Sequence, residues 1–327
     1  MKKLSLSLMT LLSSSVMASQ ELTVYTYDAF AADWGPAPAI EQAFEAVCDC
    51  DLKFVAADSS LALLRKVQLE GDSTPADVIL GLDTNSMELA RSSGLFATPQ
   101  WDPSVLSLPV EWSETQFVPF DYSIFAMVYQ KDRLPNPPAS LEALRSLPED
   151  VKFVIQDPRS STPGLGFVLW VKSVYGDQAV DFWRDIQDSV LTVTAGWSEA
   201  YNLFLEGEAE MVLSYTTSPA YHRIAENDDR FAWASFAEGH QGQIEIAGRL
   251  KSSDQPELAD RFMQFITTEG FQSAIPTGNW AYPVIDLPLP EGFEAQARPQ
   301  PFRLADPVAV EAVRKQAVDE FFSVFGG

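Results

Sequence analysis

The stretch TQFVPFDYSIFAMVYQ, residues 115–130, decides the fold. It is long, apolar and aromatic, and it contains Pro119. Because a proline cannot donate a hydrogen bond to the ladder of a central strand, the stretch predicts a strand that leaves one sheet and enters another. A second apolar run, QIEIAG at residues 243–248, is a candidate return crossing. Two crossings predict two lobes with a cleft between them.

Short β-rich runs alternate with amphipathic helices on both sides of the first crossing, which predicts an α/β fold with mostly parallel sheet. Before the crossing we expect strands at 22–27, 51–57 and 76–82, with helices at 37–47, around 61–67 and at 86–93. After it the pattern restarts, with strands expected at 151–156, 190–195 and 210–215 and helices at 162–175, 177–189, 198–205 and from Ser218. Each side therefore reads as one doubly wound lobe.

The expected division follows from these crossings. Lobe one takes residues 19–118 and about 248–290, and lobe two takes residues 119–247. Residues 291–327 form a tail, with a helix that starts at Asp306-Pro307 and carries an apolar stripe, which is Val310, Val313, Ala317, Phe321 and Val324. The stripe predicts packing on a lobe but leaves open which one.

Residues 1–18 read as a secretory signal peptide. Lys2 and Lys3 precede an apolar run at 4–12, and small residues at 16–18 resemble a cleavage site. No cysteine follows that site, so we expect a free protein in the periplasm rather than a lipid-anchored one. Beyond this segment no run of 18 apolar residues occurs, and no membrane insertion is expected.

The charge excludes several classes of partner. The chain has 22 Lys and Arg against 46 Asp and Glu, a net charge of −24. Sequence-independent nucleic-acid binding needs a basic footprint, and anionic lipid repels such a chain, so both are disfavoured. Serine-hydrolase elbows, glycine-rich dinucleotide loops and H-E-x-x-H are also missing, so the sequence favours binding over catalysis, with no cofactor and no metal.

The cysteines are Cys48 and Cys50, in the run VCDCD. An oxidising compartment favours a disulfide, but the ring would be very small, so a disulfide and two free thiols both stay open. A zinc site is disfavoured because two ligands lack the further Cys or His that zinc requires.

Hydroxyl side chains gather where strands give way to helices that begin with proline. Ser161-Thr162 and Thr217-Ser218 both stand at such positions. The free N–H groups and positive dipole end of a helix N-terminus hold a phosphate without Lys or Arg. The alternative is that Thr162 and Ser218 merely cap their helices.

Aromatic residues lie in turn-like, polar surroundings at several strand ends, where ligands bind in doubly wound sheets. Ring faces attract cations, so these side chains predict a flat or cationic ligand, although single rings of this kind often belong to a core. The set is Tyr27, Trp34, Trp197, Tyr215, Tyr221 and Trp280.

Several blocks closely resemble one protein family. They are LTVYTYDAFAADWGP, FVPFDY, IQDPRSSTPGLG, GWSEAYNLFLEGEAEMVLSYTTSPAYH and IPTGNWAYP, in order from about Leu22 to Pro283. They are similar to the periplasmic thiamine-binding proteins of Gram-negative ABC importers. The resemblance implies a two-lobed type II periplasmic binding protein fold. It also implies that the cleft binds thiamine, thiamine monophosphate and thiamine diphosphate and that the protein delivers them to the importer's permease.

By the same resemblance, aromatic side chains flank the thiazolium and pyrimidine rings, and hydroxyls with helix N-termini take the phosphate. The implied site is Tyr27, Trp34, Ser161, Thr162, Trp197, Tyr215, Thr216, Thr217, Ser218, Tyr221 and Trp280. The family pattern has an acidic residue followed by glycine where this chain has Ser59 and Ser60, with Asp58 as the nearest carboxylate. We expect Ser59 and Ser60 to keep the ligand contact through hydroxyls or backbone, with an altered preference among thiamine forms.

Two other functions stay open on this fold. A thiaminase-like enzyme would need Cys48 or Cys50 in the cleft with a carboxylate base, and their position between a helix and a strand disfavours it. A ferric-ion binding protein often uses adjacent tyrosines, and the sequence has no Tyr-Tyr pair. For a binding protein we expect the lobes to close on the ligand.

Overall fold

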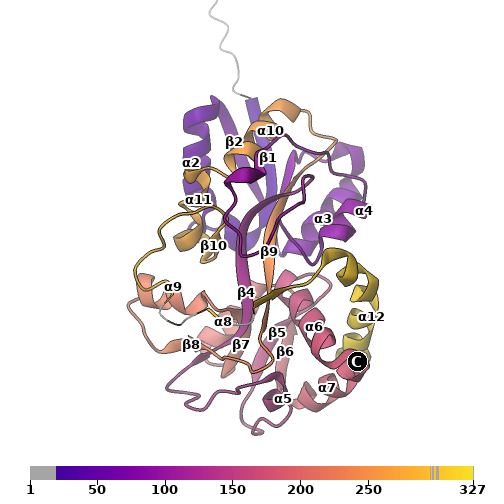
Figure 1. Ribbon diagram of the computed structural model, residues 1–327, viewed down its shortest axis with the longest axis vertical. Helices are drawn as coiled ribbons and strands as arrows, with labels where there is room; N and C mark the ends of the chain where they lie inside the picture. The colour runs from indigo at the N-terminus through magenta and orange to yellow at the C-terminus, as the bar shows by residue number, and fades with distance from the viewer. Residues whose placement is uncertain (1–19, 295, 297, 300–301, 327) are drawn as a thin grey trace, which may run out of the picture.

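The computed structural model describes residues 20–294, 296, 298–299 and 302–326 (Figure 1). The predicted signal peptide, residues 1–18, lies outside the described residues. Within them, no helix is long and apolar enough to span a bilayer.

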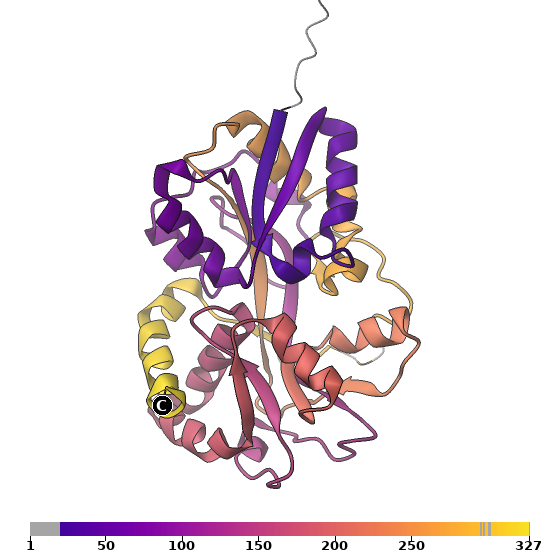
Figure 2. The same ribbon diagram turned by 180° about the vertical axis from the view of Figure 1, so that it is seen from behind.

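Two strands connect the two lobes, β4 (Val118–Gln130) and β9 (His240–Arg249). The strand order is β2-β1-β3-β9-β4-β7-β5-β6, so β4 pairs with β9 along its first part and with β7 along its second. Both strands run along the long axis of the molecule from one lobe to the other (Figures 1 and 2). The register shifts between Pro119 and Asp121, and this irregularity accommodates the missing donor of the proline. Both predicted crossings are therefore confirmed.

Lobe one builds its sheet around parallel strands with helices on both faces. Its core on one face is formed by α2, α10 and α11, and on the other by α3 and α4. Its elements are β1 (Gln20–Tyr27), α1 (Asp28–Ala31), α2 (Ala37–Cys48), β2 (Cys50–Ala57), α3 (Ser60–Glu70), β3 (Val78–Asp83), α4 (Met87–Ser92), α10 (Pro256–Phe265), α11 (Glu269–Gln272), the π-helix η5 (Ile275–Asn279) and β10 (Tyr282–Pro283).

Lobe two repeats the arrangement, with α6 and α7 on one face of its sheet and α8 on the other. Its elements are α5 (Leu141–Leu144), β5 (Phe153–Gln156), α6 (Thr162–Tyr175), α7 (Ala179–Ile186), β6 (Val190–Thr194), α8 (Trp197–Glu206), β7 (Met211–Tyr215), α9 (Ser218–Ala225) and β8 (Phe231–Trp233).

The tail returns to the body of the protein through β11 (Phe302–Leu304), which pairs with β9, and α12 (Pro307–Phe325). The Asp306 carboxylate caps α12 by accepting from the backbone N–H groups of Val308 and Ala309. The predicted stripe faces inward, and Phe321 packs edge-on against Trp183 with ring centroids 5.1 Å apart. Helix α12 contacts α6 and α7 of lobe two and also α4 of lobe one.

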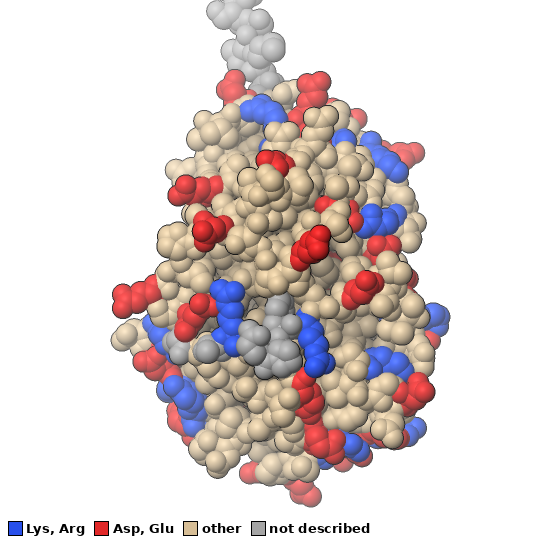
Figure 3. All heavy atoms as spheres, viewed as in Figure 1, with Lys and Arg blue, Asp and Glu red and all other residues tan. Residues whose placement is uncertain are grey.

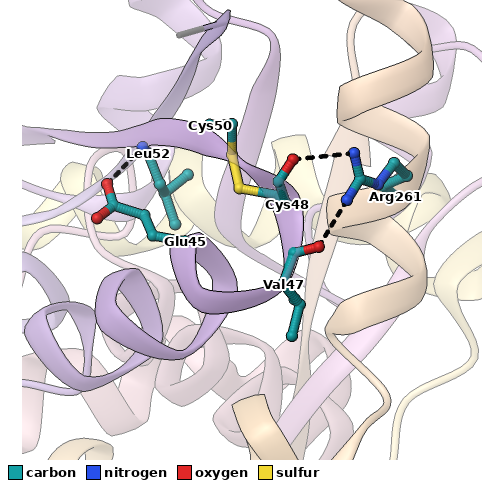
Figure 4. The surroundings of a disulfide bond; sticks show 6 residues. All are labelled: Glu45, Val47, Cys48, Cys50, Leu52 and Arg261. Carbon is teal, nitrogen blue, oxygen red and sulfur yellow. Dashed lines mark hydrogen bonds between the residues drawn. A yellow bond between two sulfur atoms is a disulfide. The ribbon is translucent and has the colours of Figure 1, made fainter.

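The two cysteines are joined in a disulfide between the end of α2 and the start of β2 (Figure 4). Their Cα atoms are 5.2 Å apart, because Asp49 between them adopts a left-handed conformation with φ 56°. Arg261 donates to the carbonyl oxygens of Val47 and Cys48 and ties this corner to α10. Of the two alternatives that the sequence leaves open, the structure therefore has the disulfide.

Candidate ligand-binding site

A cavity of about 480 Å³ lies between the two lobes. Its wall is built from residues at or just after the carboxyl ends of β1 and β2 in lobe one and of β5, β6 and β7 in lobe two. Parallel doubly wound sheets place their ligands at this end of the strands. The volume suits a small organic molecule.

Most of the predicted site residues meet in this cavity, from both lobes. Those that line it are Tyr27, Trp34, Ser59, Ser60, Ser161, Thr162, Trp197, Tyr215, Ser218, Tyr221 and Trp280. Thr216 and Thr217 do not line it: both are buried, and their hydroxyl oxygens have no partner within the described residues. A direct ligand contact of these two hydroxyls therefore stays a prediction.

The aromatic residues keep their rings accessible to the cavity. Trp34 is 57% exposed and the other five rings are half-buried, unlike side chains of a closed core. Trp280 of lobe one meets Tyr221 of lobe two edge-on, with centroids 5.4 Å apart. Trp280 is also held at φ 53°, a strained conformation for a residue with a large side chain. Such strain is kept where the surrounding structure needs a side chain in one place.

The Trp197 ring is positioned by a chain of polar contacts. Its Nε1 donates to Ser214 Oγ at 2.8 Å, and Ser214 in turn bonds Ser218 Oγ at 2.8 Å. The ring also stacks on Tyr201, with centroids 4.7 Å apart. Behind it, the Tyr201 hydroxyl is 2.9 Å from His222 Nε2, and burial lowers the pKa of that imidazole. His222 therefore supports the site from behind and does not line the cavity.

Five helices present their N-terminal residues to the cavity, namely α1, α3, α6, α8 and α9. Ser161 is the N-cap of α6, and Thr162 is its first residue rather than its cap. The side chains of Ser59 and Ser161 make no capping hydrogen bond, so these hydroxyls do not cap α3 and α6. The capping interpretation is therefore wrong for Thr162, and it is also wrong for Ser218, which is the first residue of α9 rather than its cap.

Three acidic side chains in the wall lie outside the predicted set of site residues, although the sequence singled out Asp58 as the carboxylate nearest to Ser59 and Ser60. Asp28, Asp58 and Glu245 line the cavity, whereas no Lys, Arg or His does so among the described residues. Tyr27 donates its hydroxyl proton to Glu245 Oε2 at 2.8 Å, and burial raises the pKa of Tyr27 well above its usual value. The signal in the sequence is a glutamate inside an apolar crossing strand, QIEIAG, but the pattern alone does not show which way it points.

The two lobes touch each other beside the cavity. The backbone N–H of Leu61, in α3, donates to the carbonyl oxygen of Ser160 at 3.0 Å. Beside this bond, Gly196 packs so closely on the Asp58 carbonyl that a Cβ there would lie 2.8 Å from the oxygen. The structure therefore shows the lobes closed over the cavity.

Two α/β lobes joined by crossing strands, closed over a cavity that both of them line, define a solute-binding protein. The family model of bacterial extracellular solute-binding proteins matches residues 26–273, and the chain belongs to this family.

Individual relatives show which solute-binding proteins this chain is similar to. The chain is 49% identical over 321 residues to the thiamine-binding periplasmic protein of Escherichia coli K12, covering 98% of each chain. It is 46% identical to that of Brucella abortus, covering 95% of this chain and 94% of the relative. A solved periplasmic thiamin binding protein superposes with a TM-score of 0.92 at 47% identity, covering 94% of this chain and 99% of the other. These relatives are binding proteins rather than enzymes, and the chain is a periplasmic solute-binding protein of the same kind.

Proposed function

We propose that the protein binds thiamine in the cavity between its lobes. The observation that carries this proposal is the combination of half-buried rings with acidic groups in a wall that has no basic side chain within the described residues. Thiamine has a permanently charged thiazolium ring and a flat aminopyrimidine. Ring faces and carboxylates both favour such a cation, and the named relatives at 46% to 49% identity are thiamine-binding proteins.

We extend the proposal to the monophosphate and diphosphate esters. The N-terminal residues of α3 and α6, with the hydroxyls of Ser59, Ser60, Ser161 and Thr162, lie together in the wall and suit a phosphate group. The carboxylates of the same wall repel an anion, so each added phosphate charge opposes binding. We therefore expect thiamine and its monophosphate to bind more tightly than the diphosphate.

The proposed role is delivery of this ligand to the permease of an ABC importer. Because the two lobes share the site, a bound ligand contacts both and favours the closed state, which is then the form recognised by the permease.

Acidic side chains are spread over both lobes on the face shown in Figure 3, with Lys and Arg among them.

A thiaminase-like reaction has no support in the structure. It needs a cysteine nucleophile in the cleft, but Cys48 and Cys50 are bonded to each other at the α2–β2 corner and neither lines the cavity. If the protein bound ferric ion instead, adding Fe(III) would produce a charge-transfer absorption band.

Calorimetric titration of the mature protein, unfolded and refolded to remove carried ligand, tests the proposal. We expect a one-to-one isotherm with thiamine recovered intact, and a smaller radius of gyration by solution scattering after binding. Absence of heat from folded protein would contradict the choice of ligand. Cleaved thiamine would instead indicate an enzyme.

A further inference from the structure

A row of buried carboxyl groups crosses the centre of the sheet below the cavity. Asp83 of β3 pairs in register with Glu245 of β9, which pairs in register with Asp121 of β4. Asp83 and Asp121 are 0% exposed and Glu245 is 5% exposed. Strands β4 and β9 are the two crossings, so this row lies at the junction of the lobes.

Asn279 joins the last two members of the row. Its Nδ2 lies 2.5 Å from Asp121 Oδ2 and 3.3 Å from Glu245 Oε2. Tyr27 donates to the same Glu245 oxygen, and Asp121 Oδ1 has no hydrogen-bond partner among the described residues. Only Glu245 of the row reaches the cavity wall, beside Tyr27, Tyr215 and Asn279.

The groups that face the carboxyl pair of Asp121 and Glu245 carry no positive charge. They are Tyr27 from β1, Asp83 from β3, Tyr215 from β7 and Asn279 from η5. Burial raises the pKa of Asp121 to about 7, and burial and the charge of Asp121 raise that of Glu245 well above its usual value. Two neighbouring carboxyl groups without a cation hold a proton between them near neutral pH.

We propose that Glu245, backed by Asp121, recognises the positive charge of the ligand, and that the pair gives up one shared proton to solvent when the cation binds. This inference rests on the proposed function. No covalent bond changes: a protonated pair and a permanent cation become a deprotonated pair beside that cation, plus one proton in solution. Binding then strengthens as pH rises through the pKa of the unliganded pair, and levels off above it.

The test is calorimetric titration with thiamine at about pH 7, in buffers that differ in their enthalpy of ionisation. The slope of the observed heat against that enthalpy counts the protons released. We expect about half to one proton per thiamine, and an affinity that rises by up to about tenfold per pH unit below about pH 7. A thiamine analogue with a neutral triazole in place of the charged ring should bind more weakly and release no proton.

Three variants separate the roles of Asp121, Glu245 and Asp83. Asp121→Asn should bind thiamine with less proton release and a shallower pH profile than the parent protein, and Glu245→Gln should lose at least about tenfold in affinity near pH 8. Asp83→Asn is the matched control: this carboxyl bonds Asn85 and Ser86 and does not line the cavity, so proton release should persist.

The outcomes separate this inference from the proposed function. Thiamine binding with zero slope in the parent protein overturns the inference and leaves the proposed function standing, whereas no binding by the parent overturns the proposed function. Release that persists in Asp121→Asn but vanishes in Asp83→Asn overturns the assignment to this pair. If Asp121→Asn does not fold, the buffer slope and pH profile of the parent protein still decide.

Discussion

Gly196→Ala tests whether the contact between the lobes belongs to the ligand-bound state. Gly196 has φ −142° and ψ 174°, which alanine adopts without strain, so the isolated lobe accepts the change. The new Cβ would lie 2.8 Å from the Asp58 carbonyl oxygen, against 3.4 Å or more for ordinary contact. The closed lobes must then move apart by about 0.6 Å, the difference between these two distances, at the point where Leu61 bonds Ser160.

A shift of this size lengthens the bond from Leu61 N to Ser160 O from 3.0 Å to beyond hydrogen-bonding distance. Its loss costs about 1 kcal/mol, and the loosened packing beside it adds a similar amount at most. We expect thiamine to bind about 5- to 30-fold more weakly, which corresponds to about 1–2 kcal/mol.

Calorimetry measures the affinity, and urea unfolding of the ligand-free protein supplies the second readout. The ligand-free stability should stay equal or rise slightly, because alanine lowers the entropy of the unfolded chain. Ala195→Ser, at the exposed neighbouring position, is the control and should change neither quantity. Unchanged affinity in Gly196→Ala at unchanged stability would refute the reasoning, since the bound state would then not contain this contact.

Trp280→Ala and Tyr27→Ala should each weaken thiamine binding by about 1–3 kcal/mol, because each removes a ring from the cavity wall; equal affinity in both by calorimetry would mean that the site is misplaced. Replacing Cys48 and Cys50 together with serine should leave thiamine affinity unchanged, since neither lines the cavity; lost binding in a variant that still folds by circular dichroism would argue for a role in the site. Burial raises the pKa of Asp121 to about 7, above an unfolded value of about 3.9, so its contribution to stability is complete below about pH 4 and is lost as pH rises through about 7. The melting temperature of the ligand-free protein should therefore fall between about pH 4 and 7, and less so in Asp121→Asn; identical profiles would contradict this.

Much of the architecture could be predicted from local pattern. Strand and helix periodicity placed most of the elements, and the proline inside a long apolar strand identified the first crossing. The aromatic and hydroxyl residues at strand ends could be predicted as a site because parallel strands bring their carboxyl ends to one edge of the sheet.

Local pattern failed where a contact joins distant segments. The stripe on α12 showed which face is buried, but apolar stripes are interchangeable, so only the structure shows its contacts with α6, α7 and α4. The Cys48–Cys50 bond is a local case that the sequence also left open, because it depends on the left-handed backbone of Asp49 between the two cysteines.

The sequence by itself determined the alternation of elements, the two crossings and the chemistry available at the strand ends, because these follow from the order of residues along the chain. Only the tertiary structure decided that Glu245, Asp121 and Asn279 meet below the cavity and that Leu61 reaches Ser160 beside it. Each of these contacts joins residues far apart in the chain. Strand register and lobe closure are set by the packing of the whole molecule, so no local pattern encodes them.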